Sequence, residues 1–164
     1  MRRSTAGVAL GLAVLLLGGC GFHLQGVSRL PPAFASTYLE AQDRYTDFHG
    51  ALEADLRAAG SRLVGPAEQP GATVEVLTDD SGQRVLSVSA TNQPTEYEVY
   101  YTVRYRVRIG AKEVLPAQTL TRTRDYSFNE TAVLAKEQEQ QLLTAALARD
   151  LAALVLRRLA ALQP

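Results

Sequence analysis

The sequence predicts an α+β fold, a two-layer sandwich in which two helices cover a four-stranded, mostly antiparallel sheet. Residues 96–109 alternate between apolar and polar side chains, which is the pattern of a long strand with one buried face. Residues 44–59 and 130–162 instead carry apolar side chains at helical spacing. The predicted order is β, α, β, β, β, α, and the two amphipathic helices need one apolar surface to cover, which the sheet provides.

The first two predicted elements follow the pair Pro31-Pro32 and are a strand at residues 34–40 and a helix at residues 44–59. Asp43 is the expected N-cap of this helix, and Gly60 is the expected residue just past its C-terminal end. The apolar positions of the helix recur every three or four residues and form one stripe: Tyr45, Phe48, Leu52, Leu56 and Ala59.

The next segment predicts two short alternating runs, at residues 73–78 and 84–89, that are separated by a turn. The turn is expected at residues 79–82, because Asp-Asp-Ser-Gly is a sequence typical of turns. Residues 91–95 contain an asparagine and a proline, so they are expected to bend or interrupt the chain before the long strand begins.

The long strand at residues 96–109 sorts its side chains by face. The apolar face holds Tyr97, Val99, Tyr101, Val103, Tyr105, Val107 and Ile109. The polar face holds Glu96, Glu98, Tyr100, Thr102, Arg104, Arg106 and Arg108. A turn at residues 110–112 leads to a second long strand at residues 114–128, which Pro116 weakens near its start. The faces of this second strand stay unassigned, because Gln118, Leu120, Arg122 and Arg124 do not sort cleanly.

The chain ends in a long predicted helix at residues 130–162, for which Asn129 is the expected N-cap. Its first turns are polar and its second half is apolar. Its leucines on or near one face are Leu143, Leu147, Leu151, Leu154 and Leu162. This helix is expected to complete the layer that covers the sheet.

The N-terminus predicts an export signal at residues 1–19. Arg2 and Arg3 precede an uncharged apolar stretch at residues 8–17. A helix needs about 20 apolar residues to span a bilayer, so a signal peptide fits this stretch better than a transmembrane helix. A buried core helix would leave the arginine pair and the abrupt Gly-Gly-Cys end unexplained.

The end of this signal, Leu17-Gly18-Gly19-Cys20, resembles a bacterial lipobox. The resemblance implies cleavage before Cys20 and acylation of that residue, whose acyl chains would anchor the protein firmly to a membrane. Gly21 stands where an aspartate would favour the inner membrane, so the outer membrane is expected. Residues 20–33 are then a lipidated tether, and residues 34–164 are a single domain that can fold alone.

The composition excludes several classes of function. The chain has 17 basic and 17 acidic residues, whereas a general nucleic-acid binder is usually clearly basic. One cysteine forms no internal disulfide, and two histidines and one cysteine are too few for the usual zinc sites. Motifs of serine hydrolases, nucleotide-binding loops and zinc proteases are absent, so neither catalysis nor a cofactor is expected. His49, next to Phe48 on the first helix, is expected to be a packing or surface residue.

Only three acidic residues lie in residues 81–124, so basic side chains dominate this segment. The seven basic residues are Arg84, Arg104, Arg106, Arg108, Lys112, Arg122 and Arg124. Alternate residues of one strand face lie about 6.8 Å apart, so the three arginines of the long strand repel one another. Water and salt, acidic neighbours or an anionic ligand could balance the positive charge of these arginines. Arginine suits phosphate because its guanidinium offers two parallel donors, and lipopolysaccharide is the main phosphate-rich polymer that an exported lipoprotein meets.

Four motifs follow one another along the mature chain. They are Cys-Gly-Phe-His-Leu at residues 20–24, Gln-Pro-Thr-Glu-Tyr at residues 93–97, Arg-Asp-Tyr at residues 124–126 with its continuation to residue 140, and Leu-Arg-Arg-Leu at residues 156–159. Together with the lipobox they resemble the LptE family of lipopolysaccharide-assembly lipoproteins. Each motif is weak alone, but the set spans essentially the whole mature chain in the family's order.

The resemblance implies a fold of two helices against a four-stranded sheet. It also implies a plug inside the β-barrel of the outer-membrane protein LptD, support for assembly of that barrel, and binding of lipopolysaccharide on its way to the cell surface. Lys136 matches a family lysine implicated in lipopolysaccharide contact, and Arg124 matches a family arginine. Ala90 stands where some relatives carry arginine, so this contact is lost or another residue, such as Arg84, replaces it. The alternative for Lys136 is an exposed lysine paired with Glu139 or Gln140.

The sequence therefore predicts a non-enzymatic lipoprotein, anchored to the outer membrane through Cys20 on the periplasmic side, within an LptD-like barrel. The candidate lipopolysaccharide contacts are Lys136, Arg124, Arg84, Arg104, Arg106 and Arg108. One alternative is an outer-membrane lipoprotein that carries or scaffolds something else in the periplasm. The other is a periplasmic enzyme, which would need a concave pocket with a convergent acid–base pair.

Overall fold

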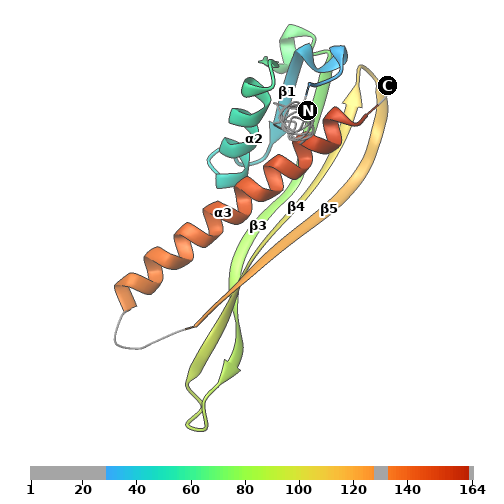
Figure 1. Cartoon of the computed structure of the whole chain (residues 1–164). Coiled ribbons are helices and arrows are strands. Elements are labelled where there is room, and N and C mark those ends of the chain that lie inside the picture. The colour runs from blue at the N-terminus through green and yellow to red at the C-terminus, as the bar shows by residue number, and fades with distance from the viewer. Residues whose placement is uncertain (1–28, 128–132, 163–164) are drawn as a thin grey trace, which may run out of the picture.

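The computed structural model describes residues 29–127 and 133–162, and it confirms the α+β sandwich. Two helices lie on one face of a mixed five-stranded sheet (Figure 1). The strands are ordered β2-β1-β3-β4-β5 across the sheet. The elements are η1 (Pro32–Ala35), β1 (Ser36–Ala41), α2 (Asp47–Ala58), β2 (Arg62–Leu63), η2 (Pro66–Glu68), β3 (Ala72–Val88), β4 (Pro94–Ile109), β5 (Lys112–Ser127) and α3 (Val133–Ala160).

The sheet has one strand more than predicted, and one of its halves is parallel. β1 pairs with both β2 and β3 in parallel, whereas β3, β4 and β5 pair antiparallel. Parallel pairing of β1 with β3 requires a crossover, and α2 supplies it. β2 contains only two residues, which is too short a stretch for any alternation to be visible in the sequence.

The turn predicted at residues 79–82 is wrong, because β3 continues through it as one strand. Asp79 pairs with Val103 and Gly82 pairs with Tyr100, so β4 holds these turn-forming residues in extended pairing. A methyl group at Gly82 would lie 2.6 Å from Tyr100 Oη, so here glycine permits a close approach instead of a turn.

The two predicted interruptions around β4 are confirmed as hairpin connections. Residues 89–93 join β3 to β4, and Asn92 adopts a φ of 61° there. Gly110 has a φ of 56° between β4 and β5, a left-handed conformation that glycine adopts without steric cost. Pro116 and Ala117 of β5 together face Arg106, which makes a bulge near the start of that strand.

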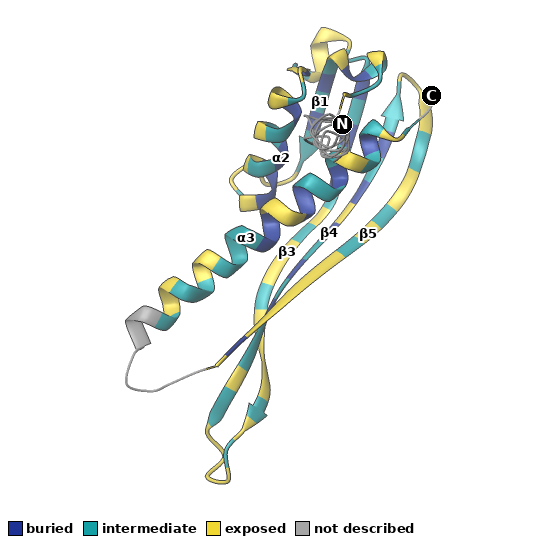
Figure 2. Cartoon of the chain, viewed as in Figure 1, coloured by how far each residue is buried: buried dark blue, intermediate teal, exposed yellow. Residues whose placement is uncertain are grey.

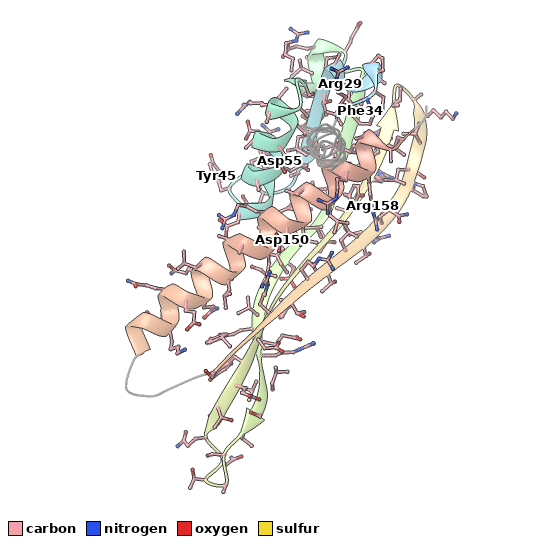
Figure 3. The ribbon with its side chains drawn as sticks, viewed as in Figure 1. Arg29, Phe34, Tyr45, Asp55, Asp150 and Arg158 are labelled. Carbon is pink, nitrogen blue, oxygen red and sulfur yellow. The ribbon has the colours of Figure 1, made fainter. Side chains whose placement is uncertain are left out.

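The start of α2 differs from the prediction, whereas its end agrees with it. Thr46 is the N-cap, and its Oγ1 accepts a hydrogen bond from the His49 backbone N–H at 3.1 Å. Asp43 is therefore not the cap, and its carboxylate accepts from the Tyr45 backbone N–H at 2.8 Å. Tyr45 precedes the helix, is 98% exposed and points away from the sheet (Figure 3), so it is not part of the apolar stripe. Gly60 has a φ of 88° just past the helix, as predicted.

The core lies where α2 and the second half of α3 cover the sheet, as the buried positions in Figure 2 show. The predicted apolar face of β4 faces this core, and the predicted polar face lies on the other side of the sheet. The fully buried helix residues are Phe48, Leu52, Leu56, Ala148, Leu151, Ala152, Val155 and Leu159. The first turns of α3 extend beyond the core, and its predicted cap, Asn129, lies outside the described residues.

Candidate functional site

The sheet face opposite the helices, called here the outer face, carries the three arginines of β4 that the sequence singles out. Arg104, Arg106 and Arg108 alternate with residues that are buried against the helices, so all three project from this face. Their neighbours come from both flanking strands. Thr78 and Thr119 flank Arg104, and Glu113 of β5 is paired with Arg108.

Acidic neighbours balance the positive charge of two of the three arginines, Arg106 and Arg108. Arg106 donates two hydrogen bonds to Glu75 of β3, from Nε to Oε2 at 2.7 Å and from Nη2 to Oε1 at 2.8 Å. Arg108 Nη2 lies 3.4 Å from Glu40 Oε2 and 3.7 Å from Glu75 Oε2. These arginines therefore join β1, β3 and β4 across the outer face of the sheet.

The hydrogen bonds from Arg106 hold the pKa of Glu75 below its usual value, and the positive charges of Arg106 and Arg108 act in the same direction. The same bonds raise the pKa of Arg106. Both groups are thus held in their charged forms. A phosphate that approaches Arg106 would have to displace a bidentate carboxylate, which is among the stronger side-chain pairings.

Arg104 and Arg84 also lie on the outer face, but their surroundings differ from those of Arg106 and Arg108. Arg104 is exposed, and no carboxylate of the described residues lies within ion-pair distance of it. Arg84 of β3 forms an ion pair with Glu98 of β4 nearer the tip of the hairpin. The four candidate arginines of the outer face therefore do not form one continuous patch of available charge.

Arg124 lies on the opposite side of the sheet from these residues. Pairing with β4 places positions 118, 120, 122 and 124 of β5 opposite the buried residues of β4, so they share the side of the helices. Arg124 Nη2 lies 3.5 Å from Asp150 Oδ2 of α3, a residue labelled in Figure 3. The structure thereby assigns the faces of β5 that the sequence left open.

Lys136 stands near the start of α3 and contacts the end of β5. Its Nζ donates to Glu139 Oε2 at 2.7 Å, which is the intrahelical pairing that the sequence offered as an alternative. The same Nζ lies 5.6 Å from the centroid of the Tyr126 ring, within the range of a cation–π contact. Tyr126 itself stacks on Tyr97 and donates from its hydroxyl to Gln83 Oε1 at 2.8 Å.

The contact between Lys136 and Tyr126 was not predicted from the sequence. Both residues belong to the strand-to-helix junction, but their distance depends on how α3 returns over the end of β5. Arg124 and Tyr126 project from the same face two positions apart, about 6.8 Å along the strand. Tyr126 thus has Lys136 against its ring and Arg124 two positions away on its own strand, and we call these three residues the junction site.

His49 of α2 is a buried histidine whose titration affects stability. It is 6% exposed, and burial lowers its pKa from 6.5. The charge of Arg44 adds to the lowering, while Glu53, Asp79 and Asp43 oppose it. The fold therefore favours the neutral imidazole, which the unfolded chain protonates at its ordinary pKa.

Lowering the pH through and below 6.5 is expected to destabilise the protein. The contribution of the neutral His49 ring to the free energy of unfolding is fully present above the pKa of the unfolded state. It is lost as the pH falls through the lower pKa of the folded state. Urea unfolding midpoints at about pH 7.5 and about pH 5.5 measure this loss. The variant His49→Gln is expected to lose less stability over the same interval, and an equal loss in both proteins would contradict the assignment.

Among residues 29–127 and 133–162, no group of three or more His, Cys, Asp or Glu side chains is placed to hold a metal ion. No helix in these ranges combines the length and the apolar character needed to cross a membrane.

Comparison with known sequences finds one family along the folded part of the chain. The model of the family LptE, described as lipopolysaccharide-assembly, matches residues 34–159. The LPS-assembly lipoprotein LptE of Pectobacterium atrosepticum is 28% identical over 160 residues, which cover 97% of this chain and 86% of that protein. The LPS-assembly lipoprotein LptE of Yersinia enterocolitica is 28% identical over 144 residues, with 87% and 69% covered.

Solved structures show the same fold. The solution structure of a lipoprotein B from Nitrosomonas europaea has a TM-score of 0.72 at 26% identity, and the match covers 86% of this chain and 91% of that one. The crystal structure of rare lipoprotein B from Shewanella oneidensis has a TM-score of 0.67 at 25% identity, with 77% and 94% covered. The similarity therefore extends over most of each solved chain.

Proposed function

The chain belongs to the LptE family of lipopolysaccharide-assembly proteins, and on this basis we propose that it is an outer-membrane lipoprotein that plugs and helps assemble an LptD-like β-barrel and binds lipopolysaccharide during its transport to the cell surface. The carrying observation is the family match over residues 34–159, which contain all five strands, α2 and all but the last residue of α3. The family is not a known enzyme family and carries no known cofactor. Acylation of Cys20 would supply the membrane anchor.

The outer face of the sheet suits the interior of a barrel. Interiors of transmembrane barrels are polar, so a plug needs a polar flank. The outer face offers ion pairs near β1 and threonines farther along, with Thr102 Oγ1 and Thr121 Oγ1 3.0 Å apart. Arg106 and Arg108 are engaged by carboxylates, so their role in this proposal is to hold the strands together while Arg104 and the threonines contact the barrel.

The junction site is the better place for lipopolysaccharide phosphates. Arg124 is 58% exposed and its partner Asp150 is 54% exposed, so water already weakens this ion pair and a phosphate can replace it. Lys136 can exchange Glu139, a partner on its own helix, for a phosphate oxygen. Tyr126, against whose ring Lys136 lies, is 9% exposed and so holds a fixed position beside this lysine.

Affinity purification of the lipidated protein from its own outer membrane tests the proposed partner. We expect a large β-barrel to co-purify in stoichiometric amount and to survive washing. Recovery of the protein alone, or with soluble periplasmic proteins only, would favour the alternative of an outer-membrane lipoprotein that acts as a scaffold or binding module.

Neutralising the junction site is expected to weaken lipopolysaccharide binding without loss of the barrel. In the double variant Arg124→Gln and Lys136→Gln, two charge-assisted contacts are lost, so the affinity for lipopolysaccharide should fall by about tenfold or more. Binding of labelled lipopolysaccharide to the purified complex measures this change. Arg62→Gln, an exposed arginine of β2 at the other edge of the sheet, is the matched control. Unchanged affinity in the double variant would exclude the junction site.

A further inference from the structure

β5 is the last strand in the order of the sheet, so one of its two edges has no strand beside it (Figure 1). Its other edge pairs with β4 along nearly the whole of Lys112–Ser127. Apart from this pairing, residues 112–127 form no backbone–backbone hydrogen bond with another described residue. Such a row of unpaired N–H and C=O groups is a template for a further strand.

The first part of this open edge is protected against pairing, but the rest is not. Pro116 has no N–H to donate, and it stands in the bulge with Ala117. Gln118 Nε2 donates to the Pro116 carbonyl at 3.1 Å. Residues 119–125 contain no proline and no bulge, and no side chain of the described residues bonds to their backbone. This regular stretch is as long as an ordinary β-strand.

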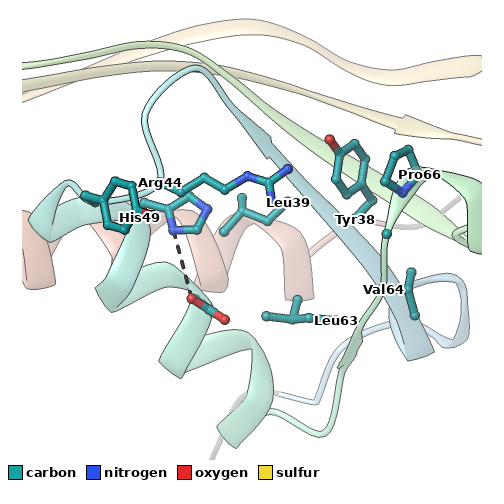
Figure 4. A pocket seen from close by; sticks show the side chains of 10 residues that line it. Tyr38, Leu39, Arg44, His49, Leu63, Val64 and Pro66 are labelled. Atoms are coloured by element: carbon teal, nitrogen blue, oxygen red, sulfur yellow. Dashed lines mark ion pairs between the residues drawn. The ribbon is translucent and has the colours of Figure 1, made fainter.

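The opposite edge of the sheet offers no such template. β2 contains only two residues there. The segment that follows it forms one wall of a groove of about 420 Å³ against β1 and α2, to which it contributes Val64, Gly65 and Pro66 (Figure 4). An added strand is therefore expected at β5 and not at β2.

The side chains of the open stretch differ between the two faces of the sheet. On the outer face, Thr119, Thr121 and Thr123 are exposed and uncharged. On the side of the helices, Arg122 and Arg124 are exposed. Neighbours on adjacent strands interact in pairs on each face, and opposite charges stabilise such a pair. An added strand would therefore meet β-branched side chains on one face and positive charge on the other.

Arg122 carries the charge that remains available at this edge. No carboxylate of the described residues lies within ion-pair distance of its guanidinium. Asp150 of α3 pairs with Arg124, so the two arginines face one aspartate. Asp125 projects from the outer face, because it is paired with Glu98 of β4. The helix side of the edge therefore stays positive and favours acidic side chains on a partner.

We propose that the open edge of β5 binds an extended segment of another protein that carries acidic side chains at alternate positions. The backbone of this segment pairs with residues 119–125, and its acidic side chains lie on the side of Arg122. Its intervening side chains are uncharged and lie beside the threonines. A second copy of this chain fits less well, because pairing two β5 edges brings their arginines close to one another. The inference goes beyond the proposed function, since it needs neither a barrel nor lipopolysaccharide.

The capped peptide Thr-Glu-Val-Glu-Val-Glu-Thr is a suitable probe, because its glutamates share one face of an extended strand. The whole mature chain in detergent micelles is titrated with this peptide while its backbone amides are followed by NMR. We expect saturable shifts in β5 and slower hydrogen exchange at alternate amides of residues 119–125, whose N–H groups point to the open edge. The same peptide with lysine in place of glutamate is expected to bind about tenfold more weakly, because its charges repel Arg122.

Methylation of the peptide backbone separates strand pairing from simple charge attraction. Methyl groups on the alternate amides of one peptide edge keep every side chain but remove the hydrogen-bond donors of that edge. We expect the peptide that is methylated on its pairing edge to bind at least about tenfold more weakly. The peptide that is methylated on its free edge is expected to bind within about threefold of the unmodified peptide.

Two exposed arginines at opposite edges of the sheet provide the matched variants. Arg122→Gln is expected to weaken peptide binding by about fivefold, because a charge-assisted contact is lost. Arg62→Gln changes the same residue type in β2 and is expected to leave the affinity within about twofold of the unchanged protein. Circular dichroism verifies that both variants are folded.

Three results would overturn the proposal. The first is unchanged hydrogen exchange in residues 119–125 at a saturating peptide concentration. The second is equal binding of the two methylated peptides, which would mean charge attraction without strand pairing. The third is slow exchange of the same amides that depends on protein concentration and not on the peptide, which would make a second copy of the chain the occupant.

Discussion

The substitution Leu151→Ala is expected to lower the free energy of unfolding by about 3 kcal/mol. Leu151 is fully buried in α3, within the layer that packs on the sheet. Truncation removes three carbon atoms from this core and leaves a cavity that the surrounding side chains fill only in part. Urea unfolding of the variant and the unchanged protein, followed by circular dichroism, measures the difference.

Leu142 is the matched control for this experiment. It lies in the same helix but is 69% exposed, so Leu142→Ala changes the same side chain without opening a cavity. Its effect is expected to stay within about 0.5 kcal/mol. Similar losses in the two variants would contradict the placement of the core under the second half of α3.

The substitution Gly71→Ala is expected to cost about 2 kcal/mol of stability, although it adds a single methyl group. A Cβ at this position would lie 2.5 Å from the backbone oxygen of Ala33. The backbone cannot easily move away, because the Gly71 N–H donates to the Ser36 carbonyl at 2.9 Å and to Ser36 Oγ at 3.0 Å. The clash therefore falls on the contact that holds the start of β3 against β1.

Gly50 provides the opposite expectation for the same change. It lies inside α2, and a Cβ there meets nothing within 4 Å. Gly50→Ala is expected to stabilise the protein by about 0.8 kcal/mol, since alanine has the higher helix propensity. Thermal unfolding of both variants measures these opposite effects. A stabilising effect of Gly71→Ala would contradict the close approach of the Ala33 backbone oxygen to Gly71.

The parts of the fold that follow from local patterns were predictable from the sequence. The faces of β4 follow from strict alternation, and the end of α2 follows from Gly60 after an apolar stripe. The hairpin at residues 89–93 follows from its turn-forming residues. Each of these features depends on neighbouring positions only, which is why one sequence was sufficient.

Other features depend on partners that are distant along the chain. Asp43 and Thr46 are both good N-cap residues, and the hydrogen bond from Thr46 to Asp79 of β3 is a tertiary contact that accompanies the cap at Thr46. The residues at 79–82 remain extended because β4 pairs with them. β2 exists only because β1 is beside it. No local pattern contains this information.

The contacts of the candidate site also include some that the sequence predicts and others that depend on the tertiary structure. The sequence identified the row of arginines on β4 and named acidic neighbours as one possible compensation, but Glu75 and Glu40 become their partners only through the strand order. The pairing of Lys136 with Glu139 could be read from their spacing along the helix. Its contact with Tyr126 required the tertiary structure.

The connections within the sheet also set an order of events in folding. β3, β4 and β5 are joined by short connections, so their pairing closes small loops at low entropic cost. β1 finds β3 only after the segment that contains α2 has been closed into a longer loop. The antiparallel meander is therefore favoured to form first and to act as the template for the parallel edge. The first strand to be synthesised is thus among the last to be incorporated.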